Sequence, residues 1–413
     1  MGLMKNQKPT KSRLPVFAQL CKLIPPHLVS KLAREHGIDK QARTFTPWSH
    51  VVSLLFAQLT HAIGLNDVCD TLRIHSRWLG SLRGAVAPTR NTLSHANKTR
   101  ESNMMEALFW QTLNHLDGLV AGGFGIRYKG LPRRFRKAIH AVDSSTIALV
   151  ANCMNWAKHR RRKAAAKLHL RLNLQSFLPG FAIVEEASHH DDTRAVALCA
   201  GLQDGEIALF DKAYVNFTHL HALTLRGVWW VTRAKDNMAY LVRKKLLRKP
   251  QGRILRDDLI LLKTPKSRAQ YPELIRRVEM IVSVDGKEVV MVFITNNTEW
   301  AASSVGELYQ ARWGIEVFFK QIKQTLQLCD FLGHSKHAIR WQLWAALLLY
   351  VLMRFLSRVV DWSHSFSRLL AIVRGVVWSR IALLELLRCY GTAGGGFRMR
   401  AACETSYLPG LAP

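Results

Sequence analysis

The stretch SVGELYQARWGIEVFFKQIKQTL, residues 304–326, has the clearest pattern in the chain. Ser304 is followed by Glu307 three residues later, which is typical of a helix N-terminus, so we expect a long helix that begins near Ser304. One side of that helix is apolar and consists of Leu308, Ile315, Phe318, Phe319, Ile322 and Leu326. A side this wide packs on other apolar residues, so the stretch predicts a helix docked on a protein core.

The opposite side of the expected helix carries one acid among basic and aromatic residues. At 3.6 residues per turn, a single stripe holds Tyr309, Arg312, Glu316 and Lys323, and Lys320 lies beside it. An ordinary solvent-exposed face with charge pairs one turn apart has the same composition. Basic side chains around one carboxylate also suit a catalytic helix that contacts phosphates, so this stretch alone leaves both interpretations open.

Two further acids follow strand-like runs upstream of this helix. Residues 138–143 (AIHAVD) end on Asp143, and residues 206–211 (EIALFD) end on Asp211. Because sites in α/β proteins form at strand ends, we expect both carboxylates to project into one crevice. Hard divalent cations prefer oxygen ligands, and three carboxylates are a minimal cage for them. Each of the two Asp residues could instead serve only as a turn or N-cap acid.

The N-terminal part of the chain, residues 1–125, is predicted to be helical. Apolar clusters at helical spacing are separated there by Pro and Gly breakers. Residues 66–94 alternate short helices with polar turns, as helix-turn-helix DNA-binding proteins do. The region is therefore either a DNA-binding domain or a helical packing module.

The rest of the chain is predicted to contain a mixed α/β core. Within residues 126–237, alternating runs on either side of Pro179-Gly180 predict a hairpin with its turn at that pair, and helices and strands then alternate. Residues 238–296 form a β-rich insertion, with a turn at Asp285-Gly286. Residues 297–375 hold the second part of the core with the Glu-bearing helix, and residues 376–413 form a helical segment and tail.

The composition predicts a polyanionic partner. The 413 residues include 59 Lys and Arg against 29 Asp and Glu, a formal net charge of +30, and a nucleic-acid backbone is the commonest partner for such a charge. A hydrophobic content of 48% excludes a disordered basic tail. The run 158–163, with Arg160, Arg161 and Arg162, favours DNA contact over a plain exposed loop. The basic run 243–256 has the same two interpretations.

The sequence argues against a membrane span, a structural zinc site and ATP. The longest apolar run, residues 343–352, is shorter than the roughly 20 residues of a span and predicts a buried helix. No apolar segment follows the basic N-terminus, so we expect a cytoplasmic protein. The seven cysteines form no CxxC pair, which predicts reduced thiols without structural zinc. The phosphate-binding GxxxxGK[ST] motif is absent, so no nucleotide cofactor is expected.

Taken together and in order, the three acidic motifs resemble those of the IS4-family DDE transposases. The family signature Y-(2)-R-(3)-E-(6)-K is matched, with its spacing intact, by Tyr309, Arg312, Glu316 and Lys323. The two Asp motifs of the family are matched by residues 143–146 (DSST) and 211–214 (DKAY), and Thr295-Asn296 is also family-like. Ala213 stands where the family often has Gly. The helical N-terminal part resembles the N-terminal domain found in one branch of the family.

The resemblance implies a multidomain α plus α/β protein. A helical N-terminal DNA-binding domain would precede an RNase H-like catalytic core that is interrupted by the β-rich insertion, and a helical C-terminal region would follow. The resemblance assigns Asp143, Asp211 and Glu316 as catalytic metal ligands, with Mg²⁺ or Mn²⁺ as the cofactor. It assigns contacts with DNA phosphates to Tyr309, Arg312 and Lys323. Lys320 and the run with Arg160, Arg161 and Arg162 would add further DNA contacts.

The implied activity is cut-and-paste transposition of an insertion sequence. The protein would bind the terminal inverted repeats, cleave the strands and transfer them to target DNA, acting as a homodimer across two ends and associated with the bacterial nucleoid. Two alternatives stay open: an RNase H-like nuclease that cleaves without joining, and an inactive DNA-binding relic. Retention of all three acids and of the helix signature disfavours the relic.

Overall fold

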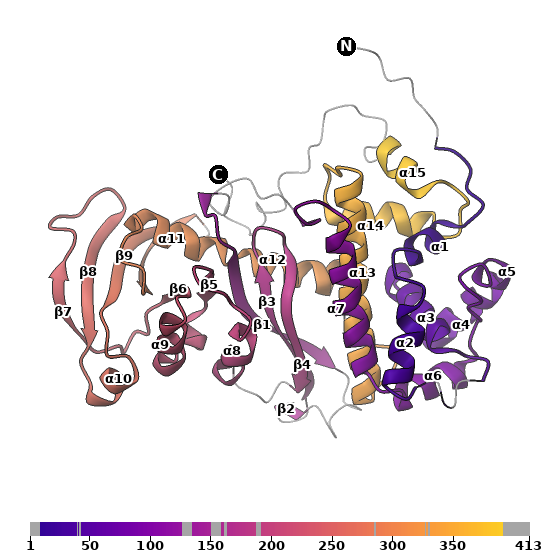
Figure 1. The fold of residues 1–413 in the computed structure, drawn as a ribbon, viewed down its shortest axis with the longest axis horizontal. Helices are drawn as coiled ribbons and strands as arrows, with labels where there is room; N and C mark the ends of the chain where they lie inside the picture. Colours follow the sequence, from indigo (N-terminus) through magenta and orange to yellow (C-terminus); the bar gives the residue numbers. More distant parts are fainter. Residues whose placement is uncertain are drawn as a thin grey trace, which may run out of the picture. The chain divides into compact units, whose positions relative to one another are not determined.

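The computed structural model describes residues 9–38, 40, 43–125, 134–149, 158–160, 163–186, 191–284, 286–326, 328 and 331–390. The chain forms two compact units (Figure 1). A helical unit takes its described residues from within 1–125, 147–166 and 320–404, and a sheet-based unit takes them from within 126–146 and 167–319. The mixed α and β content agrees with the expected fold class, and the five domain boundaries drawn from the sequence remain predictions.

In the described part of the chain, ten strands form one sheet. Their order is β2-β3-β1-β5-β6-β10-β9-β8-β7, with β4 paired to β3. The strands are β1 (Ile139–Leu149), β2 (Lys158–Arg160), β3 (Lys163–Asn173), β4 (Leu178–Glu186), β5 (Ile207–Phe210), β6 (Trp229–Arg233), β7 (Tyr240–Lys245), β8 (Ile254–Leu262), β9 (Ile275–Val284) and β10 (Lys287–Thr295). Non-consecutive neighbours in this order show that the chain crosses over the sheet repeatedly.

Three parallel strands at the centre of the sheet bring the two Asp residues together. In register, Val142 of β1 pairs with Phe210 of β5, and Phe210 pairs with Thr232 of β6. The pairing of β1 with β5 ends at this row. Asp143 and Asp211 are therefore the next residues on two adjacent strands, which confirms that both acids lie at one edge of the parallel pairing.

The β-rich insertion extends the same sheet rather than forming a separate one. β10 runs antiparallel to β6, with Thr295 opposite Val231 and Phe293 opposite Arg233. β9, β8 and β7 then follow, each antiparallel to its neighbour. Residues 238–296 are thus joined to the central strands by backbone hydrogen bonds.

Helices cover both faces of the sheet. In β10, Ile294 belongs to the core cluster that contains Leu220 and Leu223, whereas the neighbouring Phe293 ring lies 4.9 Å from Tyr309. Successive strand residues point to opposite faces, so α9 (Phe217–Leu225) covers one face and α11 (Ala302–Ala311) covers the other. The remaining helices of this unit are α8 (Asp191–Cys199), a 3₁₀ turn (Lys212–Tyr214), α10 (Pro265–Gln270) and α12 (Gly314–Lys320).

Two predictions about the strands were wrong. The hairpin turn lies before β4, not at Pro179-Gly180, because the Asn173 side chain accepts hydrogen bonds from the amides of Gln175 and Ser176 and so closes a turn there. Gly180 instead lies within β4, where its carbonyl accepts a hydrogen bond from Arg171 at 3.2 Å. β1 also continues beyond Asp143 to Leu149, so this acid follows the pairing with β5 and not the end of the strand.

The predicted long helix is divided into shorter pieces. α11 begins at Ala302 with Ala301 as its N-cap, so Ser304 is not the cap, and Glu307 pairs with Arg134 at 3.7 Å instead. α11 ends at Ala311, and α12 begins at Gly314. Between them, backbone amides bond three residues back, as from Trp313 to Gln310 at 3.0 Å, which tightens the chain at the junction. A π-helix over Gln321–Thr325 follows.

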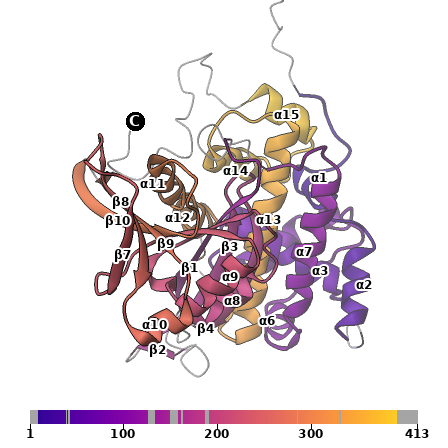
Figure 2. The same cartoon turned by 60° about the vertical axis from the view of Figure 1, so that its left-hand side comes forward.

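The helical unit is built around α13 (Lys336–Val359), which packs against α3 and α7 (Figure 2). Its other helices are α1 (Val16–Cys21), α2 (Leu28–Glu35), α3 (Pro47–Thr60), α4 (Leu65–Ile74), α5 (Ser76–Leu79), α6 (Arg90–Thr99), α7 (Asn103–Gly118), α14 (Phe366–Gly375) and α15 (Leu383–Cys389). Length and composition would let α13 cross a membrane, but 94% of its apolar window is buried inside the structure. This is the buried helix predicted for residues 343–352, with apolar residues on all sides.

The cysteines of the described part of the chain are free thiols, namely Cys21, Cys69, Cys199 and Cys389. Burial raises the pKa of Cys21 and of Cys199 to about 12, with nearby arginines opposing that effect. Both thiols are therefore poor nucleophiles, and we assign them to packing.

Candidate catalytic site

The two Asp side chains are fixed by the backbone that follows them. The Oδ1 atom of Asp143 accepts a hydrogen bond from the Ser144 amide at 2.7 Å, and Oδ1 of Asp211 accepts one from the Lys212 amide at 2.6 Å. Asp211 is also the N-cap of the 3₁₀ turn. Asp211 thus has the N-cap function considered for it, whereas Asp143 lies inside β1 and is neither an N-cap nor a turn residue. In both acids one oxygen is held in place by the bond to the next amide.

Arg312 joins the first acid to the third. Its Nη1 lies 2.9 Å from Oδ2 of Asp143, and its Nη2 lies 2.9 Å from Oε1 of Glu316. The Arg312 side chain is only 7% exposed, against 20% for Asp143 and 41% for Glu316. The junction between α11 and α12 places this guanidinium between two carboxylates, in a geometry where charge-assisted hydrogen bonds are strong.

Tyr309 connects the second acid to the same cluster. Its hydroxyl donates a hydrogen bond to Oδ1 of Asp211 at 3.4 Å, and the Arg312 guanidinium lies 5.4 Å from the centre of its ring. Tyr309 is 3% exposed and packs on Phe293. The polar stripe predicted for this helix is therefore not a solvent-exposed face, because Tyr309 and Arg312 point inward at the two Asp residues.

The pKa values show how closely these charges are coupled. Burial raises the pKa of Asp143 to about 6, Arg312 and the Ser144 amide oppose the rise, and Asp211 and Glu316 add to it. Burial alone would lower the pKa of Arg312, but Tyr309 and the three carboxylates raise it above its ordinary value. Three acids around one permanent cation therefore form a single electrostatic cluster.

The chemistry of this cluster fits a divalent cation. Three carboxylates are hard oxygen donors, and a positive charge already lies between two of them. Among the described residues, no group of three or more His, Cys, Asp or Glu side chains is close enough to hold an ion as it stands. The guanidinium of Arg312 explains this, since it occupies the space between the carboxylates of Asp143 and Glu316.

The other predicted residues that the structure describes, Lys320, Lys323 and Arg160, belong to the helical unit. Lys320 is exposed at the end of α12, and Lys323 is half-buried in the π-helix, where burial lowers its pKa. Arg160 ends β2, and Arg161 and Arg162 lie outside the described residues.

Sequence reasoning missed one residue near the site, Arg233, and did not predict the contacts of Asn296 at the other end of β6. Arg233 ends β6 one residue after Thr232, and its charge lowers the pKa of Tyr309 while burial raises it. One pattern in the sequence could have identified Arg233. The strand-like run 227–233 ends on this Arg, just as the runs 138–143 and 206–211 end on Asp. Asn296 was noted only as family-like; its side chain bonds to Trp230, Val228 and Thr224.

Comparison with known proteins shows the family of this chain. A family described as "Transposase DDE domain" matches residues 134–352, and a domain of unknown function (DUF4372) matches residues 12–82. The "Probable transposase for insertion sequence element IS5377" of Geobacillus stearothermophilus is 29% identical over 337 residues, which cover 81% of this chain and 83% of that protein. "Transposase InsG for insertion sequence element IS4" of Escherichia coli K12 is 29% identical over 198 residues, 46% of this chain and 43% of that protein.

Among solved structures, the piggyBac transposase synaptic complex with hairpin DNA has a TM-score of 0.45 and 9% sequence identity, covering 90% of this chain and 80% of that chain. The family match spans both Asp motifs and the whole helix signature, from Asp143 to Lys323. It extends over more than half of the 413 residues. The chain belongs to the Transposase DDE domain family and is a DNA transposase of the IS4 type.

Proposed function

We propose that this transposase cuts and rejoins DNA at the ends of its own insertion sequence with Asp143, Asp211 and Glu316 as its catalytic carboxylates. The observation that carries the proposal is the convergence of these acids, from β1, β5 and α12, on Arg312 and Tyr309. The strand order β4-β3-β1-β5-β6, with its last three strands parallel, supports the RNase H-like core that the family resemblance implies.

The three carboxylates would hold Mg²⁺ or Mn²⁺, which when bound would polarise phosphate oxygens and make a water or a 3′-hydroxyl more acidic. Asp143 must lose its proton to serve as a ligand, and the buried environment that raises its pKa makes this step dependent on pH. The amides of Ser144 and Lys212 hold one oxygen of each Asp, which leaves the second oxygen to act as a ligand.

Arg312 would change partners when DNA binds. A guanidinium released from Asp143 has the planar fork that binds phosphate oxygens bidentately, and it already lies beside the catalytic acids. Tyr309 would keep Asp211 oriented through its hydroxyl. Catalysis would then consist of positioning and of electrostatic stabilisation of an in-line displacement at phosphorus.

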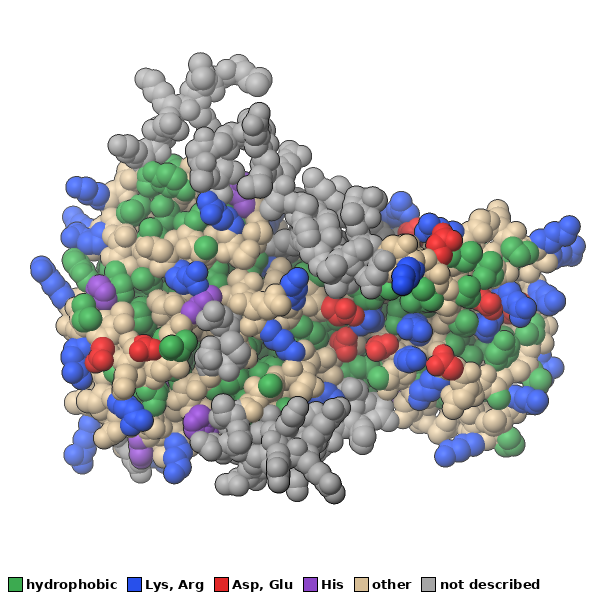
Figure 3. Space-filling view, turned by 180° about the vertical axis from the view of Figure 1, so that it is seen from behind, with side chains coloured by type: hydrophobic (Ala, Val, Ile, Leu, Met, Phe, Trp, Pro, Cys, Tyr) green, Lys and Arg blue, Asp and Glu red, His purple; other side chains and the backbone are tan. Residues whose placement is uncertain are grey.

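The partner in this proposal is duplex DNA at two ends of the element, held by a homodimer, and Mg²⁺ is the physiological ion. Figure 3 shows Lys and Arg side chains spread over the face in view, with far fewer Asp and Glu, as expected of a net charge of +30. Such a surface neutralises phosphates and raises the rate of encounter with DNA.

The test is excision and integration of a marker flanked by the DNA that borders the gene on each side. Wild type, Glu316→Gln and the matched control Glu307→Gln are compared; Glu307 is an exposed acid on α11 that pairs weakly with Arg134. We expect wild type and Glu307→Gln to move the marker, and Glu316→Gln to lose at least about two orders of magnitude of activity. Activity of Glu316→Gln equal to wild type would refute the assignment of the third acid.

The same DNA separates transposition from simple cleavage. A transposase yields excised element and insertions at new sites, whereas a nuclease yields only broken donor DNA. Donor breakage without insertions by wild type would replace the proposal with the nuclease alternative, and binding of the ends without breakage would replace it with the relic.

A further inference from the structure

We infer that α6 (Arg90–Thr99) is the helix with which this protein reads the base sequence of duplex DNA. The inference rests on the proposed function, because it names the surface that would recognise the ends of the element. It starts from the exposed face of α6, which carries Arg90, Asn91, Ser94, His95 and Lys98. At 100° per residue these five positions fall within about 140° of the helix circumference.

The exposed face of α6 is unusual for a helix that only faces solvent. The helix RNTLSHANKT contains no acid and therefore no internal ion pair, and Asn, Ser and His are weak helix formers. Within the described part of the chain, the side chains of Asn91, Ser94 and Lys98 make no hydrogen bond or ion pair. A surface helix selected only for stability would carry Glu, Lys and Gln at these positions.

The opposite face of α6 is anchored in the helical unit. Leu93, Ala96 and Asn97 are buried there, and Oδ1 of Asn97 is 2.8 Å from Nε2 of His50 on α3. The His50 ring in turn packs on Trp341 of α13, with ring centres 4.3 Å apart. A buried polar pair is costly to rearrange, so this contact fixes the rotation of α6 about its axis.

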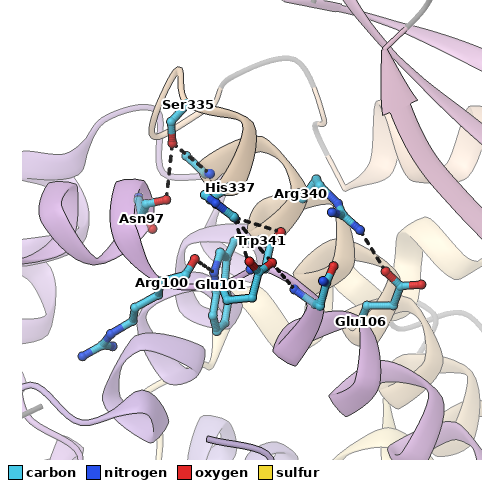
Figure 4. Close-up of polar contacts among 11 residues, drawn as sticks. Asn97, Arg100, Glu101, Glu106, Ser335, His337, Arg340 and Trp341 are labelled. Atoms are coloured by element: carbon cyan, nitrogen blue, oxygen red, sulfur yellow. Dashed lines mark hydrogen bonds and ion pairs between the residues drawn. The ribbon is translucent and has the colours of Figure 1, made fainter. Parts of the chain in front are cut away.

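The C-terminal end of α6 is also held, as Figure 4 shows. The carbonyl of Arg100 accepts a hydrogen bond from the Trp341 indole at 3.0 Å, and the carbonyl of Asn97 accepts one from the Ser335 hydroxyl at 3.4 Å. Ser335 is itself the N-cap of α13. At the other end of the helix, Thr89 caps the first turn through the Thr92 amide. The polar face is thus presented by a helix that is fixed at both ends.

The side chains on this face suit base edges in a major groove. Arg pairs with guanine, Asn pairs with adenine, and Ser accepts or donates at either base, while Lys suits a phosphate. A helix of ten residues, about 15 Å long, fits a major groove, and its N-terminal residues are the ones that reach base edges in helix-based DNA readers. Two positive charges without an acid fit a polyanion and oppose docking of a second copy of this basic chain.

The test measures binding of the full chain, without divalent metal, to two duplexes of equal length. One carries the end of the element, and the other carries the same bases in scrambled order. The variant Asn91→Ala/Ser94→Ala alters the reading face, and the matched control Asn114→Ala/Ser30→Ala makes the same exchanges at exposed positions of α7 and α2. Alanine is the better helix former, so the melting temperature should not fall in any of these variants.

We expect the preference for the end duplex over the scrambled duplex to fall by about tenfold or more in the α6 variant, and to persist in the control. Binding to the scrambled duplex should stay within about twofold of wild type, because no phosphate contact is removed. An unchanged preference would overturn the inference, as would an equal loss on both duplexes. A wild type without any preference would also overturn it, whereas the marker assay with Glu316→Gln judges the transposase activity independently.

Discussion

At the scale of single residues, Arg312 joins the carboxylates of Asp143 and Glu316, two of the three proposed metal ligands. Without it, the partly buried carboxylates of Asp143 and Glu316 would face each other without a counter-charge. A divalent cation held by the three acids would have to displace the guanidinium from Asp143, so the proposed site would exchange one cation for another. That exchange gives the first prediction, because it couples the stability of the protein to the metal.

We predict that Arg312→Gln lowers the free energy of unfolding by about 3 kcal/mol in metal-free buffer, because removal of one partner of a buried pair leaves unpaired charge. Mg²⁺ should recover much of this loss by taking over the charge balance. The control is Arg276→Gln, which breaks the buried pair with Asp257 at 2.7 Å in the same unit. Urea unfolding with and without Mg²⁺ should show recovery only for Arg312→Gln; equal recovery in both variants would contradict the exchange.

The raised pKa of Asp143 predicts a pH dependence of metal binding. The folded-state value of about 6 lies above the ordinary 3.8, so in metal-free protein this carboxyl takes up a proton as the pH falls through 6. Since a ligand must be deprotonated, Mn²⁺ affinity should be constant above about pH 7 and should fall by about tenfold for each pH unit below 6. Calorimetric titration with Mn²⁺ checks this prediction. An affinity that falls only below pH 4 would show that the pKa of Asp143 is not raised.

The residues of the site could be predicted from the sequence, but their contacts could not. The spacing from Tyr309 to Lys323 selects positions on one side of a helix, and the strand-like runs select the two Asp residues. In the fold, Arg312 pairs with Asp143, which lies 169 residues earlier in the sequence. The Arg312 side chain points inward because the chain tightens between α11 and α12. No local pattern encodes that direction, so a buried cluster had the sequence signature of a solvent-exposed stripe.

At the scale of elements, the structure departs from the sequence where side chains bond to the backbone. α9 (Phe217–Leu225) lies where helices and strands were predicted to alternate, because its apolar residues and its N-cap, Asn216, are local signals. The turn before β4 depends on hydrogen bonds to the Asn173 side chain. The sequence prediction placed the turn at the nearby Pro179-Gly180 pair, because that pair is the stronger local turn signal. Local propensity therefore identified the elements themselves, and side-chain bonds decided where some of them begin and end.

Asn296 links three elements at the end of β10, which gives an element-scale prediction. Its Oδ1 accepts from the Trp230 amide at 2.9 Å, and its Nδ2 donates to the Val228 carbonyl and to the Thr224 hydroxyl. Asn296→Asp keeps the shape but replaces the donor with a second acceptor facing a carbonyl. We expect a loss of about 1–3 kcal/mol in thermal or chemical unfolding. The same exchange at exposed Asn237, between β6 and β7, should change stability by less than about 0.5 kcal/mol; equal effects would rule out this role.

At the scale of the whole molecule, buried histidines make both units sensitive to acid. Burial lowers the pKa of His50 in the helical unit to about 3 and that of His219 in the sheet-based unit to about 4, with nearby arginines adding to both shifts. Each folded-state value lies below the ordinary 6.5, so the unfolded chain binds more protons. The stability from neutral burial is full above pH 6.5 and is lost as the pH falls towards 4.

We therefore predict that the free energy of unfolding falls between about pH 6.5 and pH 4.5, and that His50→Gln reduces this dependence by about one proton. The amide of Gln can still donate to Asn97, so the variant should fold, although it should be less stable than wild type at pH 7.5. Chemical unfolding as a function of pH measures the number of protons as a slope. An unchanged slope in His50→Gln would show that this histidine is not the group that titrates.

The charge of +30 makes DNA binding a property of the whole surface, and its salt dependence can be divided among the basic runs. Each phosphate contact contributes about 0.9 to the slope of log affinity against log salt concentration. We predict that replacing Arg160, Arg161 and Arg162 by Gln lowers this slope by about two to three on duplex DNA of any sequence, because these side chains would track the backbone. The comparison variant replaces the three exposed basic residues of β7, Arg243, Lys244 and Lys245. A slope that changes only in the β7 variant would place the main phosphate contact on the insertion, and a slope that changes in neither would leave both runs as solvated surface.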